Sequence, residues 1–329
     1  MKRYTNILLD KTAKIVLCDP KNKQLFMDMI LLLVGRKVAD LKFLNIEQHG
    51  LADSDKSVNF DLLCQAADTG ELFIVEIQNR SQDSFADRML SYATYPIRRQ
   101  LAQKEELLRQ AAEGLIDERE LDRMDYSLYP LYVLCIVNFA MPHETEDSLE
   151  DGLVSRYSIR NDASGELMTH ALHFVFLELG RLKQRNGESA QCGSLLQQFA
   201  YSWRYMHLQE GIPVTFKDPL VQGLYRAAEY ANLTIEQQQL YDKIMTTELD
   251  IIAQNRRAFK DGEAAGLEKG LRKGEEKGLR KGLSQGKAEG KAEGLAEGQI
   301  AAAKRLIATM GLDPEAVAKE LGVPKDKLQ

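Results

Sequence analysis

Two short apolar runs separated by a glycine-containing turn begin the predicted sheet. Residues 58–64 alternate or run apolar, residues 66–70 end in glycine, and residues 71–78 run apolar again. Apolar, β-prone runs on either side of a short glycine turn are typical of a β-hairpin. We therefore expect two antiparallel strands here, with the acidic Glu76 inside the second.

A longer apolar run at residues 130–139 is rich in β-branched side chains. Strands that are covered on both faces have such continuous apolar runs, so this segment is predicted at the centre of the sheet. Two further strands are expected at residues 153–159 and 168–177, on either side of the turn at 161–165. Residues 38–48 have a mixed, strand-like pattern.

Helical patterns alternate with these strands and then replace them. Residues 22–34 follow Asp19-Pro20 and precede Gly35, and these flanking residues are typical start and stop signals of a helix. Further helices are expected at 83–100, with a charged helical insertion to about 122, and at 195–206 and 220–257. The pattern predicts an α/β fold, a mixed sheet flanked by helices, followed by an all-helical C-terminal region.

Glycine then recurs at every fourth position, ten times from Gly262 to Gly298. Each interior glycine costs a helix about 1 kcal/mol relative to alanine, and a four-residue step drifts about 40° around the helix axis. Two interpretations remain, a closely packed helical assembly or a weakly helical charged linker, and the pattern favours the linker or a nascent helix. Residues 299–329 resemble a small helix-turn-helix.

Charge and hydropathy bear on whether the protein binds nucleic acid and whether it is a membrane or secreted protein. At 329 residues the chain is long enough for about two domains. Its net charge is −6, so a nucleic-acid partner would need a local basic patch, because the net field repels phosphate. No apolar stretch approaches the roughly 20 residues that span a bilayer, and the N-terminus lacks the apolar core of a signal peptide. We expect no membrane segment and a cytoplasmic location.

Asp61, Glu76 and Gln78 form the candidate site. Strand periodicity puts Glu76 and Gln78 on one face, and a hairpin brings Asp61 beside them. Acidic groups in an apolar strand are costly to bury unless they are paired or bind a cation. Mg²⁺ prefers carboxylate, carbonyl and water oxygens, which makes Asp61, Glu76 and the backbone carbonyl of Ile77 candidate ligands. Alternatively, both acids face solvent at a sheet edge.

A second pair of candidate residues lies on the helix predicted after this hairpin. Arg88 and Tyr92 are one helical turn apart, so they can face the site together and contact phosphate. An ordinary amphipathic helix would explain the same spacing.

The order Asp61, then Glu76-Ile77-Gln78, resembles the D-x(n)-(E/D)-x-K signature of the PD-(D/E)XK nucleases. The surrounding residues look like the recombination-promoting nuclease and putative transposase branch of that superfamily. The similarity extends to residues 19–25, 85–92 and 130–139 and to the glycine-repeat tail, and so to nearly the whole chain.

The resemblance implies a restriction-endonuclease-like core with a four-stranded mixed sheet and Mg²⁺- or Mn²⁺-dependent endonucleolytic cleavage of DNA. Asp61 and Glu76 would be catalytic metal ligands, and Gln78 would occupy the lysine position. The expected organisation is a nuclease-like domain at 1–180, a helical region at 181–260, the repeat at 261–298 and the helix-turn-helix-like segment at 299–329.

The chain departs from the family pattern at two positions. Gln78 is neutral and cannot supply the charge of a lysine, although it can orient water or phosphate by hydrogen bonds. Ala13 stands where the family has an aromatic residue. Two functions therefore remain: a DNA endonuclease of recombination or mobile elements whose C-terminal region oligomerises or positions DNA, or a catalytically weakened DNA-binding or assembly protein that retains the fold.

Overall fold

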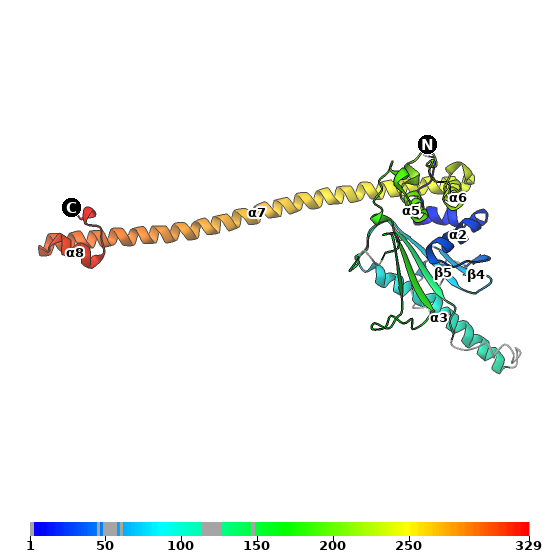
Figure 1. Cartoon of the computed structure of the whole chain (residues 1–329). Coiled ribbons are helices and arrows are strands. Elements are labelled where there is room, and N and C mark those ends of the chain that lie inside the picture. Colours follow the sequence, from blue (N-terminus) through cyan, green and yellow to red (C-terminus); the bar gives the residue numbers. More distant parts are fainter. Residues whose placement is uncertain are drawn as a thin grey trace. The chain divides into compact units, whose positions relative to one another are not determined.

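The computed structural model describes residues 3–44, 62–113, 127–145 and 149–328, together with the backbone of 47–48 and 58–59. The chain divides into two compact units, Met1–Thr246 and Thr247–Gln329. Figure 1 shows the elements of both. In the part of the chain that the structure describes, no helix is both long and apolar enough to cross a membrane.

A mixed sheet of six strands lies at the centre of the first unit, in the order β1-β4-β5-β6-β8-β7. Strands β5, β6 and β8 are parallel, and β1, β4 and β7 are antiparallel to their neighbours. The resemblance implied four strands; the short edge strands β1 and β7 extend the sheet to six. The bounds are β1 (Leu41–Phe43), β4 (Leu62–Ala66), β5 (Leu72–Gln78), β6 (Leu131–Val137), β7 (Val154–Ser158) and β8 (Leu172–Glu178), with a separate pair β2 (Glu47–Gln48) and β3 (Val58–Asn59).

The predicted hairpin and central strand are both confirmed. Leu62 lies opposite Val75, and Gln65 lies opposite Leu72, so β4 and β5 are joined by the turn that ends at Gly70. Gly70 has φ +74°, a conformation that glycine adopts without a steric cost. Strand β6 lies between β5 and β8, and all seven of its residues are buried.

Helices cover both faces of the sheet. The helices are α1 (Asp10–Leu17), α2 (Lys23–Val34), α3 (Phe85–Ala112), α5 (Leu195–Tyr205), α6 (Pro219–Ala227), α7 (Ile235–Met310) and α8 (Pro314–Leu321). Short 3₁₀ turns are η1 (Pro20–Asn22), η3 (Leu179–Arg181), η4 (Ser189–Gln191), η5 (Met206–Leu208), η6 (Tyr230–Asn232) and η7 (Lys325–Lys327). Helix α2 ends at Gly35 as predicted, whereas α1 was not predicted, and α3 continues past residue 100 through the charged segment.

The helix predicted over residues 220–257 is wrong in one respect, because it is interrupted between α6 and α7. The side-chain amide of Asn232 donates to the carbonyl oxygen of Arg226 at 2.8 Å and stabilises the bend. Thr234 and Gln237 then exchange two side-chain to backbone hydrogen bonds, of 2.9 and 3.2 Å. This reciprocal pair is a capping box, which starts a new helix.

Two apolar cores hold the layers together. Helices α1, α2, α5 and α6 pack on the face of the sheet that carries Val75, Leu134 and Leu177. Helix α3 packs on the other face through Phe85 and Met89. The first core includes residues from α5 and α6, so it continues past residue 180, where a boundary of the nuclease-like domain was expected.

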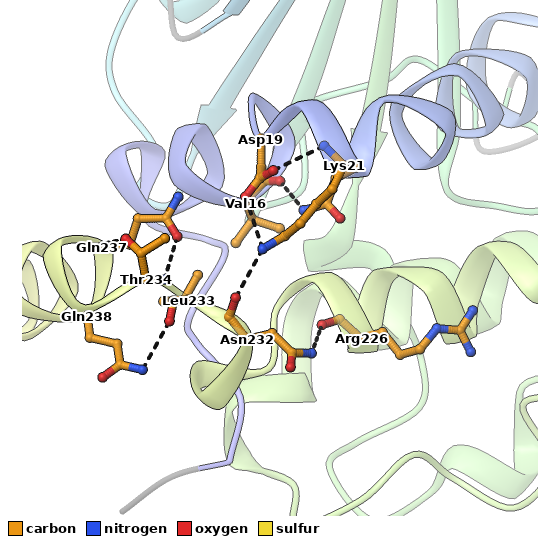
Figure 2. Close-up of polar contacts among 10 residues, drawn as sticks. Val16, Asp19, Lys21, Arg226, Asn232, Leu233, Thr234, Gln237 and Gln238 are labelled. Carbon is orange, nitrogen blue, oxygen red and sulfur yellow. Dashed lines mark hydrogen bonds and ion pairs between the residues drawn. The ribbon is translucent and has the colours of Figure 1, made fainter.

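The Asp19-Pro20 segment has a structural role. The Asp19 carboxylate accepts a hydrogen bond from the backbone N–H of Lys21 at 3.1 Å and lies 3.1 Å from its ammonium group. Figure 2 shows the Lys21 side chain reaching from Asp19 to the backbone carbonyl of Asn232, at 3.0 Å. These contacts join the connection between α1 and α2 to the bend that precedes α7.

The glycine repeat is helical over its whole length, as part of α7. A helical conformation agrees with both interpretations of the repeat, so the choice between an assembly and a linker stays a prediction. Leu, Glu, Lys, Arg and Ala fill most of the positions between the glycines, and all are strong helix formers. Ala303, Val317 and Val323 contribute to a small apolar core between the end of α7 and α8.

Candidate active site

Glu76 and Gln78 lie near the carboxyl end of β5, on the face of the sheet that α3 covers. Side chains alternate along a strand, and Leu72 and Ile74, which precede them on this face, pack in the core beneath α3. Glu76 is only 6% exposed. It therefore does not face solvent, which was the alternative considered for the acidic residues.

Arg88 joins these two side chains from α3. Its Nη2 donates a hydrogen bond to Oε1 of Gln78 at 2.8 Å and lies 3.6 Å from Oε1 of Glu76. It also donates to the side-chain oxygen of Gln82. The guanidinium of Arg88 therefore lies beside a buried carboxylate and a neutral amide near the carboxyl end of β5.

Helical spacing explains why Arg88 and Tyr92 face this site together. Phe85 and Met89, four residues apart, anchor the first turns of α3 in the core. The Arg88 guanidinium lies 5.2 Å from the ring centroid of Phe85 and 5.8 Å from that of Tyr92. Such cation–π contacts attract the guanidinium to the faces of the two rings. The structure thus brings together Glu76, Gln78, Arg88 and Tyr92.

The other two predicted site residues are Asp61 and Ile77. Asp61 lies outside the described residues, so its place in the site stays a prediction. The side chain of Ile77 is buried in the core on the opposite face of the sheet, which leaves its backbone carbonyl as the ligand that the prediction requires. Within the described ranges, no three His, Cys, Asp or Glu side chains gather closely enough to hold a metal ion.

Two asparagines that sequence reasoning missed follow directly after the parallel strands. The backbone N–H of Asn138 donates to the carbonyl of Gln78 at 2.9 Å, and its side-chain amide donates to Oδ1 of Asn79 at 2.9 Å. Polar residues at the carboxyl ends of parallel strands are a common position for functional groups in α/β proteins. That position was the available signal for both.

Glu178 is a second buried carboxylate at the carboxyl ends of the parallel strands. Gln78, Val137 and Glu178 lie in register across β5, β6 and β8. The carboxylate of Glu178 is fully buried and has four partners. They are the backbone N–H of Met141 at 2.8 Å, Nε2 of His143 at 2.5 Å, the hydroxyl of Ser155 at 3.1 Å and Nε of Arg181 at 2.7 Å. All of its oxygens are thus engaged in holding the loop after β6.

Comparison with known protein families identifies the family of this chain. A family described as PD-(D/E)XK nuclease family transposase matches residues 8–258. The match includes the sheet, α1 to α6 and the start of α7, but it ends before the glycine repeat. Neither the curated proteins nor the solved structures gave a match. Because the family match spans well over half of the chain and contains the site at β5, this protein belongs to the PD-(D/E)XK nuclease family transposases.

Proposed function

We propose that this protein is a Mg²⁺-dependent DNA endonuclease of the recombination-promoting type, which hydrolyses phosphodiester bonds. The observation that carries the proposal is the buried carboxylate of Glu76 near the carboxyl end of β5, 3.6 Å from the guanidinium of Arg88. A buried carboxylate suits a hard cation, and an adjacent guanidinium suits a phosphate. Family membership supports nuclease chemistry at this place.

The donor groups fit a magnesium or manganese ion. Glu76 would supply one carboxylate, and the backbone carbonyl of Ile77 a second oxygen. Asp61 would be the other acidic ligand; in the sequence it precedes Leu62, which pairs with Val75, the neighbour of Glu76. When bound, such an ion activates water and offsets charge on the scissile phosphate.

Arg88 would take over the electrostatic role that a lysine has in the family signature. Gln78 stands in the lysine position and is neutral, so it can orient water or phosphate but cannot balance a negative charge. Its Oε1 already accepts a hydrogen bond from Arg88. A guanidinium stays charged at all working pH values and binds phosphate oxygens through two parallel donors. We infer that Arg88 binds the phosphate, with Tyr92 holding its guanidinium in place.

Replacing Arg88 with methionine is expected to slow cleavage by about 100-fold, because one preorganised donor to a developing negative charge contributes about that much. Arg88→Lys should retain part of the rate, since it keeps the charge but not the two parallel donors. Single-turnover nicking rates measure both. Arg109→Met, on the exposed end of the same helix, is the control. Equal losses in Arg88→Met and Arg109→Met would contradict the role of Arg88.

Nicking of supercoiled plasmid tests the proposed function directly. The wild-type protein should nick DNA with Mg²⁺ or Mn²⁺ and stop when EDTA removes the metal. Asp61→Ala and Glu76→Ala, purified in the same way, should both lose this activity. Absence of nicking in the wild type, or equal nicking in all three proteins, would favour a protein that binds DNA without cutting it.

That second function is a catalytically weakened DNA-binding or assembly protein. Gln78 in the lysine position favours it, and so does the surface of the glycine repeat. Five leucines each follow a glycine of the repeat and remain 55–69% exposed: Leu267, Leu271, Leu279, Leu283 and Leu295. Exposed leucines at regular spacing commonly mark a protein contact.

We infer that this part of α7 associates with α7 of a second copy. Glycine allows helix backbones to approach closely, and burial of the leucines would offset the helix instability that the glycines cause. The full-length wild-type protein should be oligomeric by light scattering, and Leu271→Lys with Leu279→Lys should shift it toward the monomer. Leu312→Lys, an exposed leucine outside the repeat, is the control. A monomeric wild-type protein would contradict this inference.

A further inference from the structure

A groove with a volume of about 500 Å³ lies between α3 and the β1–β4–β5 side of the sheet. Lys42, Leu63, Leu72, Arg99, Lys104 and Tyr129 are among its lining residues, and we call it the Tyr129 groove. Leu63 and Leu72 belong to the core beneath α3, so the groove opens on the same face as Glu76. Leu72 precedes Glu76 by four residues on β5, a distance of about 13 Å along the strand.

The charge of the groove is opposite to that of the whole protein. Lys42, Arg99 and Lys104 line it, and no carboxylate does so among the described residues. The chain as a whole has a net charge of −6. Lys42 and Arg99 make no ion pair within the ranges that the structure describes, whereas Lys104 donates to the backbone carbonyl of Ser127. A local excess of cations of this kind indicates an anionic ligand.

An exposed tyrosine is held rigidly at the edge of this groove. Tyr129 is 51% exposed. The buried amide of Gln100 accepts from the backbone N–H of Tyr129 at 2.8 Å and donates to its carbonyl at 3.3 Å. The ring lies against Gly70, where a Cβ atom would be 2.6 Å from the tyrosine ring. The backbone of Tyr129 is therefore held by the buried side chain of Gln100, and its ring lies against a glycine that leaves space for it.

The floor and walls of the groove complete a surface for a flat, partly apolar group. Leu44, Leu63 and Leu72 supply the floor, while Gln65 and Gln103 present side-chain amides. A nucleotide combines a flat base, polar base edges and a phosphate, which match an aromatic ring, amides and cations respectively. The base must be unpaired, because a base within a duplex cannot expose its face to a tyrosine ring.

We propose that the Tyr129 groove binds one unpaired nucleotide of the DNA strand whose phosphodiester lies at Glu76, with the base on Tyr129 and the phosphate at Arg99 and Lys42. This proposal rests on the proposed endonuclease function. The distance of about 13 Å along β5 between Leu72 of the groove and Glu76 corresponds to roughly four steps of 3.4 Å in duplex DNA. The preferred substrate is then DNA with a single-stranded segment within a few nucleotides of the cut.

Fluorescence anisotropy of the full-length protein in EDTA tests the groove without cleavage. The probes are a short fluorescein-labelled single strand and a blunt duplex of the same sequence. The wild type should bind the single strand more tightly, and Tyr129→Ala should weaken that binding about ten-fold with little change for the duplex. Tyr129→Phe keeps the ring and should bind as the wild type does. Arg99→Gln should reduce the affinity and its salt dependence, whereas Arg226→Gln, an exposed arginine on α6, should do neither.

Unchanged single-strand binding by Tyr129→Ala, with unchanged thermal unfolding, would overturn the proposal. So would displacement of the oligonucleotide by free thymidine monophosphate at equal phosphate concentration, since the groove would then take a free nucleotide. Plasmid nicking separates the two ideas. If the wild type nicks DNA and Tyr129→Ala binds the single strand normally, the groove proposal is wrong and the endonuclease function stands. If binding depends on Tyr129 but the wild type does not nick DNA, the endonuclease function is wrong and the groove stands as a single-strand binding site.

Discussion

Glu76→Gln is expected to lower metal-dependent plasmid nicking by about 100-fold or more. Glutamine has the shape of glutamate, so the packing of β5 beneath α3 should persist. It lacks the negative charge that a divalent cation requires of its ligands. The neutral side chain would also leave the Arg88 guanidinium without the carboxylate that lies 3.6 Å away. Both changes should weaken metal binding and the positioning of Arg88 without creating a cavity in the core.

Nicking rates at several Mg²⁺ concentrations, together with calorimetric titration of Mg²⁺, distinguish a lost ligand from a damaged fold. Glu76→Gln should need far more metal or fail to bind it, while its unfolding in urea stays close to that of the wild type. Glu106→Gln is the matched control, because Glu106 is an exposed glutamate paired with Arg109 on α3. Normal nicking by Glu76→Gln would show that the cleavage chemistry lies elsewhere.

Glu178→Ala should destabilise the first unit by about 3–5 kcal/mol, the usual cost of removing one partner from a buried ion pair. Glu178 is fully buried, and its loss would leave Arg181, His143, Ser155 and the N–H of Met141 without their shared acceptor. Arg181 is only 16% exposed, so water cannot readily replace the carboxylate. Glu178→Gln keeps the shape and one acceptor oxygen, and should cost about 1–3 kcal/mol.

Urea unfolding followed by tryptophan fluorescence measures this effect in the intact chain. Trp203 is the one tryptophan in the sequence, and it is fully buried in the core of the first unit. Glu150→Ala is the control, because Glu150 pairs with Arg156 at the surface, where an ion pair contributes at most about 1 kcal/mol. If Glu178→Ala were as stable as Glu150→Ala, the network would not hold the loop after β6.

Several features were accessible from sequence because they depend on neighbours along the chain. The shared face of Glu76 and Gln78 follows from the two-residue period of a strand, and the pairing of Arg88 with Tyr92 follows from the helical turn. The central position of β6 follows from its unbroken apolar composition. The Thr234-x-x-Gln237 capping box was also present in the sequence, so the interruption before α7 had a local signal that the long apolar pattern obscured.

Other features were decided only by packing between distant segments. The distance between Arg88 and Glu76 depends on how α3 lies across the sheet, which no local pattern specifies. Three of the four partners of Glu178 come from the loop after β6 and from β7, and they meet Glu178 only when β6, β7 and β8 are assembled. Tyr129 reaches Gly70 and Gln100 across long stretches of chain. Backbone periodicity is a property of adjacent residues and can be read from sequence, whereas the site's charges and the groove depend on contacts that form only when remote elements pack together.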